Sequence, residues 1–111
     1  MSKQSDERLE KGSAIPIKIA PFNPYGNHVS VVLSATVAYS AQARPKGASL
    51  ILVQAIIQNI RFRLDGVAPT TTVGFQIVKS DPAIIIPIGS NSKPMFIAET
   101  AGAILNYQWG D

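Results

Sequence analysis

The sequence predicts an all-β protein, folded as a β-sandwich of two packed sheets with about eight strands. The chain has 111 residues, which is enough for one domain and one hydrophobic core. From residue 14 onward apolar side chains recur with a period of two, in β-branched runs separated by Gly, Pro, Asn and Asp. No long segment keeps the 3.6-residue spacing of a helix. We therefore predict a single β-sandwich domain over residues 14–111.

The expected strands follow one another at short intervals. In the first, "AIPIKIA", three isoleucines alternate with Pro16 and Lys18. In the second, "VSVVLSATVAYS", Leu33 and Val37 share one face with Tyr39. The remaining runs are "SLILVQ", "AIIQNIRFRL", "VGFQIVK", "AIIIPI", "KPMFIAE" and "AILNYQW". Gly74, inside "VGFQ", is predicted to mark a bulge or a close backbone contact.

Two sheets of four strands are the simplest packing of these runs. A jelly roll is the first choice of topology, and an immunoglobulin-like sandwich is the alternative. Pro16 and Pro87 lack a ladder donor, so their strands are expected at sheet edges or bulges. The core is predicted from one face of each strand: Ile15, Ile17, Leu33, Val37, Ile60, Phe62, Phe75, Ile77, Ile84, Ile86, Leu105, Tyr107 and Trp109.

The stretch "NIRFRLDGVAPTTTVGF" (residues 59–75) is predicted to form strand, turn and strand. The period of two places Phe62 inward and Arg61 and Arg63 on the opposite, hydrated face. Asp65-Gly66 supplies the backbone angles of a tight turn. The alternative interpretation is that Arg61 and Arg63 form an exposed basic stripe that docks on an acidic partner surface.

Residues 1–13, "MSKQSDERLEKGS", form a charged segment with almost no apolar side chains. It is predicted to be either a disordered tail or an arm that becomes ordered against a partner. Its basic residues Lys3, Arg8 and Lys11 are, together with Arg61 and Arg63, the candidate partner-binding residues.

The composition argues against several classes of function. The net charge is +3, and its cations are scattered, which argues against a nucleic-acid binder. There is no cysteine, so disulfides and Cys-ligated metals are excluded. No apolar run reaches the length of a membrane span, and no secretion signal is visible at the N-terminus.

The inventory of catalytic groups is equally sparse. His28 is the only histidine, and it lies beside Gly26 and Asn27 in a predicted loop. No metal-binding spacing, nucleophile elbow or phosphate-binding glycine loop is present. We therefore expect no enzymatic activity, no cofactor, no metal and no small-molecule substrate. A hydrolase that uses His28 is the remaining enzymatic alternative.

Half of the chain resembles small virion proteins of tailed bacteriophages. The resemblance lies in "QNIRFRLDGVAPTTTVGFQIVKSDPAIIIPIG" and "KPMFIAETAGAILNYQWG", about residues 57–110. Together with its length, the chain looks like the jelly-roll capsid decoration proteins of short-tailed phages of the epsilon15 kind. The resemblance implies a structural protein on the outer capsid surface, made in the host cytoplasm, that bridges neighbouring major capsid protein subunits.

Further expectations accompany this resemblance. Self-association as a dimer across a two-fold axis is expected, because that is the commonest symmetry of homo-oligomers. One alternative is a neck or tail component of the phage. Another is a carbohydrate- or receptor-binding β-sandwich, which would expose aromatic side chains such as Trp109 or Tyr25. The phase of "AILNYQW" nevertheless places Tyr107 and Trp109 in the core.

Overall fold

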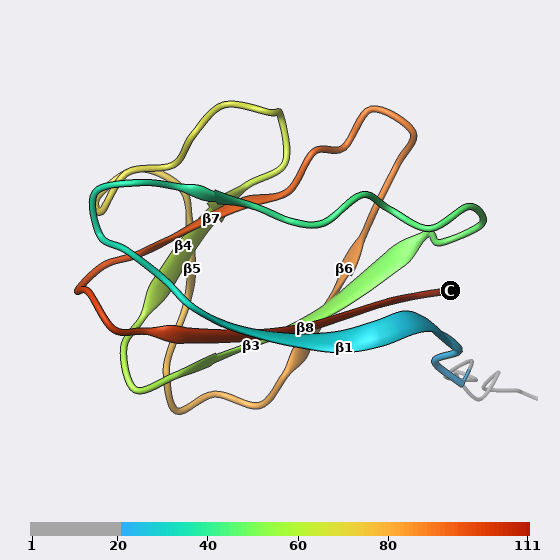
Figure 1. Cartoon of the computed structure of the whole chain (residues 1–111), viewed down its shortest axis with the longest axis horizontal. Coiled ribbons are helices and arrows are strands. Elements are labelled where there is room, and N and C mark those ends of the chain that lie inside the picture. Colours follow the sequence, from blue (N-terminus) through green and yellow to red (C-terminus); the bar gives the residue numbers. More distant parts are fainter. Residues whose placement is uncertain (1–20) are drawn as a thin grey trace, which may run out of the picture.

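The computed structural model describes residues 21–111, and it confirms the all-β sandwich (Figure 1). Residues 1–13, the strand predicted at 14–20 and its Pro16 lie outside the described residues. The strands are β1 (Pro24–Val32), β2 (Tyr39–Ser40), β3 (Leu50–Ile56), β4 (Ile60–Arg63), β5 (Phe75–Ile77), β6 (Ile84–Pro87), β7 (Met95–Ala98) and β8 (Ile104–Gly110). The described part of the chain contains no helix, and therefore none that could cross a membrane.

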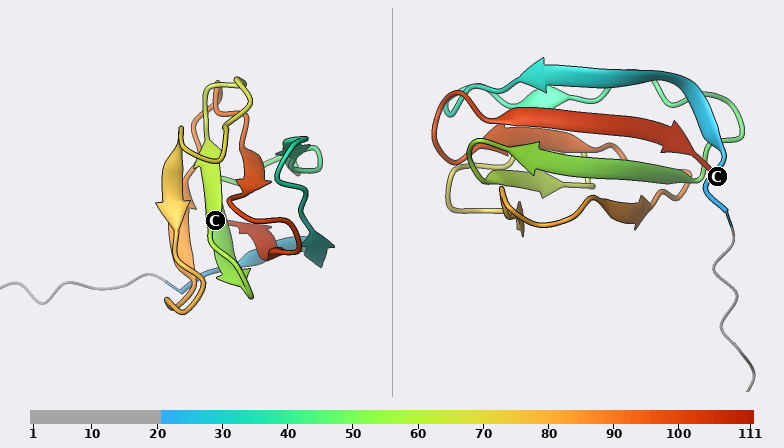
Figure 2. Two further views of the ribbon diagram at one scale, coloured as in Figure 1. Left: turned by 90° about the vertical axis from the view of Figure 1, so that its left-hand side faces the viewer. Right: turned by 90° about the horizontal axis from the view of Figure 1, so that it is seen from below.

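The strand order is that of a jelly roll. One antiparallel sheet has the order β1-β8-β3-β6 and the other the order β2-β7-β4-β5. The first strand thus pairs with the last, the second with the seventh, the third with the sixth and the fourth with the fifth. This is the pattern of one long hairpin rolled into two layers, which Figure 2 shows face to face. The predicted jelly roll is therefore confirmed, and the immunoglobulin-like alternative is wrong.

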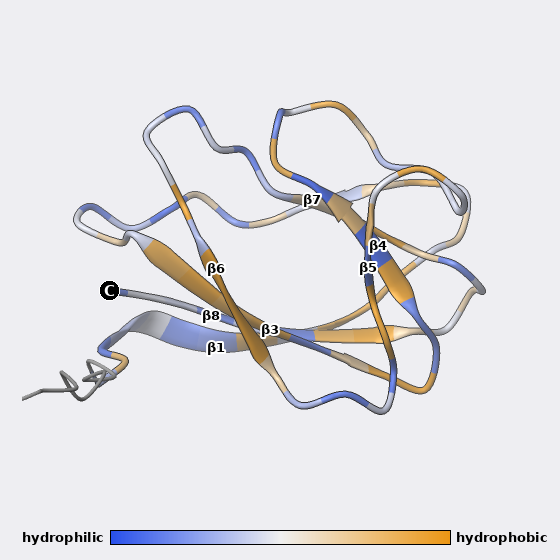
Figure 3. Ribbon diagram, turned by 180° about the vertical axis from the view of Figure 1, so that it is seen from behind, coloured by the Kyte–Doolittle hydropathy of each residue, from blue (hydrophilic) through white to orange (hydrophobic). Residues whose placement is uncertain are grey.

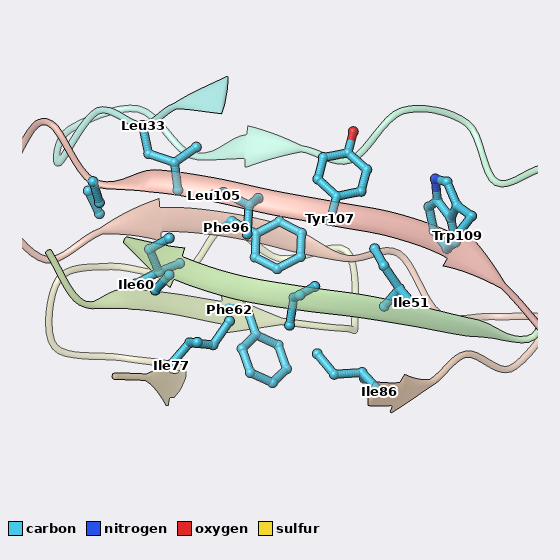
Figure 4. Close-up of a cluster of buried hydrophobic side chains, with 14 of the residues drawn as sticks. Leu33, Ile51, Ile60, Phe62, Ile77, Ile86, Phe96, Leu105, Tyr107 and Trp109 are labelled. Atoms are coloured by element: carbon cyan, nitrogen blue, oxygen red, sulfur yellow. The ribbon is translucent and has the colours of Figure 1, made fainter. Parts of the chain in front are cut away.

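The core lies between the two sheets and is centred on Phe96 and Tyr107 (Figure 4). Phe96 is fully buried, and its ring lies 6.3 Å from that of Tyr107 and 6.1 Å from that of Phe62. The buried residues that the sequence predicted correctly are Leu33, Ile60, Phe62, Ile77, Ile86, Leu105, Tyr107 and Trp109. Ile15 and Ile17 lie outside the described residues.

Three predicted core residues are exposed instead. Phe75 is 69% exposed and Ile84 is 40% exposed, although each is paired with a core residue of the neighbouring strand. They belong to β5 and β6, which are the edge strands on the same side of the sandwich. Their inward faces therefore lack a neighbour on one side. Pro87 also lies in β6, which confirms that its strand is an edge strand.

Val37 is exposed for a different reason. The predicted run from residue 29 to residue 40 is broken after β1, because the Ser34 side chain organises a turn. Ser34 Oγ accepts the backbone N–H groups of Thr36 at 3.0 Å and Val37 at 3.2 Å. Hydroxyl side chains compete with sheet pairing in this way, and Val37 leaves the core as a consequence.

The connection between β3 and β4 contains the only non-glycine residue with a positive φ among residues 21–111. Ile57 has φ 76°, and the N–H of Gln58 donates to the carbonyl of Ile56 at 2.9 Å, as in a γ-turn. A β-branched side chain in this conformation is strained. The sequence analysis placed these residues inside one continuous run, "AIIQNIRFRL", so this tight turn was not predicted.

Replacing Ile57 with glycine is expected to stabilise the protein by about 1 kcal/mol. Glycine relieves a strain of roughly 1–3 kcal/mol and costs about 0.5–1 kcal/mol in backbone entropy. Ile57 is 55% exposed, so little burial is lost. Thermal unfolding measures the effect. The adjacent substitution Ile56→Gly is the control, and it should lower the melting temperature because Ile56 lies in β3. A lower melting temperature for Ile57→Gly would show that the turn is not strained.

Candidate functional site

The four strands of sheet β1-β8-β3-β6 carry no Lys, Arg, Asp or Glu. Their sequences are "PYGNHVSVV", "ILNYQWG", "LILVQAI" and "IIIP". The dominance of apolar residues in β3 and β6 is visible in Figure 3. One face of this sheet covers the core, so its other face is an uncharged surface on the outside of the molecule.

The pairing register shows which side chains form this outer face. Buried Ile51, Val53 and Ala55 alternate along β3 with residues that point outward. Outward residues of neighbouring strands then lie side by side in rows, because paired residues share a face. The rows are Val32, Ile104 and Ile56; Ser30, Asn106 and Gln54; and Gln108, Leu52 and Ile85. We call these nine residues the uncharged face.

The uncharged face combines aliphatic side chains with amides. A shallow depression of ≈ 90 Å³ lies on it and is lined in part by Leu52, Gln54 and Asn106. His28 borders this depression, with its Nε2 3.4 Å from Asn106 Oδ1. A surface of this kind can bind another protein surface with little cost for desolvating charges. The sequence did not reveal it, because its four strands are not consecutive.

The opposite sheet carries the predicted arginines, and Arg61 has a structural partner. Its Nε donates to Glu99 at 2.6 Å, and one terminal nitrogen donates to the Gly74 carbonyl at 3.0 Å. Glu99 also accepts hydrogen bonds from Gln76 at 2.7 Å and Asn59 at 3.4 Å. Burial alone would raise the pKa of Glu99, but the hydrogen bonds from Arg61, Gln76 and Asn59 outweigh it, so this pKa is lowered.

Arg63 lies on the same face but pairs locally. Its guanidinium donates two hydrogen bonds to the Asp65 carboxylate, at 3.1 Å and 2.6 Å. The hydrogen bond from Arg63 lowers the pKa of Asp65. The pair is more exposed than that of Arg61 and Glu99. Lys3, Arg8 and Lys11 lie outside the described residues, so the structure brings together only Arg61 and Arg63 among the candidate partner-binding residues.

Removing Arg61 is expected to destabilise the fold, whereas removing Arg63 is not. Arg61→Ala leaves a partly buried Glu99 without its cation and should cost about 1 kcal/mol near neutral pH. Because the pKa of Glu99 is lower in the folded protein than in the unfolded chain, ionised Glu99 stabilises the fold at a pH above its unfolded pKa. This stabilisation is lost as the pH falls through its folded pKa.

Urea unfolding at pH 7 and pH 3 checks this prediction. The difference in the free energy of unfolding between wild type and Arg61→Ala should be smaller at pH 3 than at pH 7. Arg63→Ala is the matched control on the same strand and should unfold like wild type at both values. Equal effects of the two substitutions would contradict the distinction between them.

A second surface feature is a groove beside β5. It has a volume of ≈ 870 Å³ and lies between the segment that follows β4 and the segment that follows β6. Its lining residues are Arg63, Leu64, Asp65, Val73, Gly74, Phe75, Gly89, Ser90, Asn91 and Ser92. We call it the Phe75 groove, because the ring of Phe75 is its largest exposed apolar group and lies 5.5 Å from the ring of buried Phe62.

The backbone conformation of the groove wall at position 74 requires a glycine. Gly74 has φ +134°, and a Cβ there would lie 2.9 Å from the carbonyl oxygen of Phe62. The predicted close backbone contact at Gly74 is thus confirmed. It brings the segment before β5 against β4 and leaves Phe75 projecting beside it.

Neither of the aromatic side chains that a carbohydrate- or receptor-binding sandwich was expected to expose, Trp109 and Tyr25, is fully exposed. Trp109 is 4% exposed and belongs to the core, as the phase of its strand predicted. Tyr25 is partly buried, and its hydroxyl donates to Asp111 at 2.8 Å, which raises its pKa. The exposed aromatic side chain is Phe75, which the sequence placed inside.

Residues 21–111 contain no group of three or more His, Cys, Asp or Glu side chains placed to hold a metal ion. The only polar contact of the His28 ring among these residues is the one to Asn106. No protein-family model, no curated protein and no solved structure matches the chain.

Proposed function

We propose that this chain is a structural protein that binds another protein through the uncharged face. In its specific form, the proposal is that it decorates and stabilises a phage capsid by bridging neighbouring major capsid protein subunits from the outer surface. The single observation that carries the proposal is a four-stranded outer sheet without a charged residue. The capsid role rests in addition on the resemblance of residues 57–110 to phage virion proteins.

The uncharged face has the character of a surface that becomes covered. Val32 is 68% exposed and Ile85 48% exposed, and they stand at opposite edges of the same sheet. Between them lie Ser30, Gln54, Asn106 and Gln108, whose side chains can donate and accept hydrogen bonds across an interface. Charged residues are depleted in the buried part of protein–protein interfaces, and this face shares that feature, with amides in its middle row and aliphatic side chains in the rows on both sides.

The arrangement of the fold suits a clamp on a symmetric shell. The short edge strand β6 carries Pro87, which limits uncontrolled edge pairing. Binding then uses the face of a sheet instead of its edge. On a shell that repeats the same site many times, modest contacts become effective through multivalency.

Co-sedimentation tests the function. Purified full-length chain is mixed with shells assembled from the major capsid protein of the same genome, and bound protein is measured in the pellet. We expect wild type to sediment with the shells and Ile85→Asp to stay largely in the supernatant, because the substitution places a charge in the contact. Val37→Asp is the matched control, since Val37 is an exposed aliphatic residue outside the sheet.

Two outcomes would contradict the proposal. Wild-type protein that remains entirely in the supernatant would argue against the capsid role. Equal loss of binding in Ile85→Asp and Val37→Asp would argue against the uncharged face as the contact surface. Circular dichroism of each variant confirms that the fold is retained.

A further inference from the structure

We propose that the Phe75 groove binds Ile15, Ile17 and Ile19 of a second copy of this chain, so that two copies exchange their N-terminal segments. This inference concerns self-association and does not depend on binding to a capsid. Two features have complementary chemistry: the structure contains an open apolar groove, and the sequence contains an apolar segment with strand-like alternation.

The groove is an opening in the core rather than a surface feature added to it. Phe75 faces inward, in register with buried Phe62, and yet is 69% exposed. Val73, beside it, is 49% exposed. Because β5 is an edge strand, nothing among the described residues covers this end of the inner layer. An apolar occupant would complete it.

The polar groups of the groove favour an apolar occupant over a sugar. Arg63 and Asp65 line it, but their charged groups are bound to each other at 2.6 Å and 3.1 Å. Ser92 Oγ accepts the N–H of Gly89 at 3.0 Å. The charged groups of the groove are thus already paired with each other, while Leu64, Val73 and Phe75 supply an apolar wall.

The sequence of this chain contains a segment of matching chemistry. In "AIPIKIA", Ile15, Ile17 and Ile19 alternate with Pro16 and Lys18, so an extended chain would present three isoleucines on one side. Pro16 has no N–H to donate, which is compatible with binding as an outer strand. Lys18, on the other side, would remain in water.

The position at which the described chain begins identifies the source of the segment as a second copy. Residue 21 precedes β1, the edge strand opposite to β6, and Asn23 is tied to Asp111 by two backbone hydrogen bonds. The groove lies at the β5 edge of the other sheet. Three strand spacings of about 4.8 Å and a sheet separation of about 10 Å put Phe75, on its β5 side, roughly 17 Å away.

The same chain cannot place all three isoleucines in this groove. At about 3.5 Å per residue, Ile19 reaches at most about 7 Å from residue 21, Ile17 about 14 Å and Ile15 about 21 Å. Only Ile15 could approach Phe75 of its own domain, so a groove filled by the whole segment needs a second copy. In a two-fold dimer each copy can donate its segment to the other, and the same contact then forms twice.

Disulfide trapping tests the inference, and the absence of cysteine from the chain makes the background clean. Full-length Ile17→Cys and full-length Ser90→Cys, which carry different tags, are mixed and oxidised. We expect a covalent heterodimer, because Ser90 lines the groove. A mixture of Ile17→Cys with Val37→Cys is the matched control and should give little product, since Val37 lies outside the groove.

Light scattering of the full-length chain gives the second measurement. Phe75→Ser and Ile17→Asp are each expected to raise the dimer dissociation constant at least tenfold, whereas Val37→Ser and Lys18→Ala leave it unchanged. The inference is overturned by a wild-type monomer at micromolar concentration, or by dimers that persist in both variants, which would indicate another interface. An intrachain disulfide in the double variant Ile17→Cys/Ser90→Cys, without interchain product, would also overturn it.

Discussion

Replacing Phe96 with alanine is expected to lower the free energy of unfolding by about 3–5 kcal/mol, the range for truncating a fully buried phenylalanine. Phe96 has no exposed surface, and its ring lies between those of Phe62 and Tyr107. The cavity would open at the centre of both sheets, where the jelly roll cannot collapse to fill it. For a domain of this size, that is a large share of the total stability.

Phe75→Ala is the matched control for this prediction. Phe75 lies in the same sheet and in the same row as Phe96, with Phe62 between them. Because Phe75 is 69% exposed, its truncation should cost less than about 1 kcal/mol in the monomer. Urea denaturation of the two variants at a concentration that favours the monomer measures both values. Similar losses in the two variants would show that Phe75 is buried and that the groove is closed.

Alkaline pH is expected to destabilise the protein through Tyr107. Burial is the main cause that raises the pKa of Tyr107 to about 12, and the neighbouring hydroxyl of Tyr39 adds to it, while the hydrogen bond from the Gln42 N–H opposes it. The ordinary value near 10 applies to the unfolded chain. Stability from the neutral phenol is therefore complete below about pH 10 and is lost as the pH rises towards 12, by roughly 2–3 kcal/mol.

Denaturant unfolding at pH 8, 10 and 11.5 checks this dependence, with Tyr107→Phe as the comparison. The variant should lose about 1 kcal/mol at pH 8, because the Gln42 N–H loses its acceptor at 3.0 Å. Above pH 10, the free energy of unfolding of the variant should decrease less steeply with pH than that of wild type. Tyr25 also has a raised pKa, but it is present in both proteins and cancels from the comparison. If the free energy of unfolding decreased equally steeply with pH in both proteins, Tyr107 would be excluded as the source of the alkaline destabilisation.

The residues of the candidate surfaces illustrate what sequence reasoning could reach. The alternation in "NIRFRL" placed Arg61 and Arg63 correctly on one face, since strand geometry is local. It treated them as a pair, yet Arg61 binds Glu99, 38 residues away, while Arg63 binds Asp65, two residues away. Only the first of these contacts depends on which strands become neighbours.

The sequence by itself determined the class of fold, the inward face of the central strands and the edge position of Pro87. These properties follow from side-chain alternation and from the missing N–H of proline, which act within a few residues. The tertiary structure decided which inward faces remain uncovered, as at Phe75 and Ile84, and which four strands join into a sheet without charge. The physical reason is that a strand's periodicity shows which side is apolar, whereas the burial of that side depends on neighbours distant in the chain.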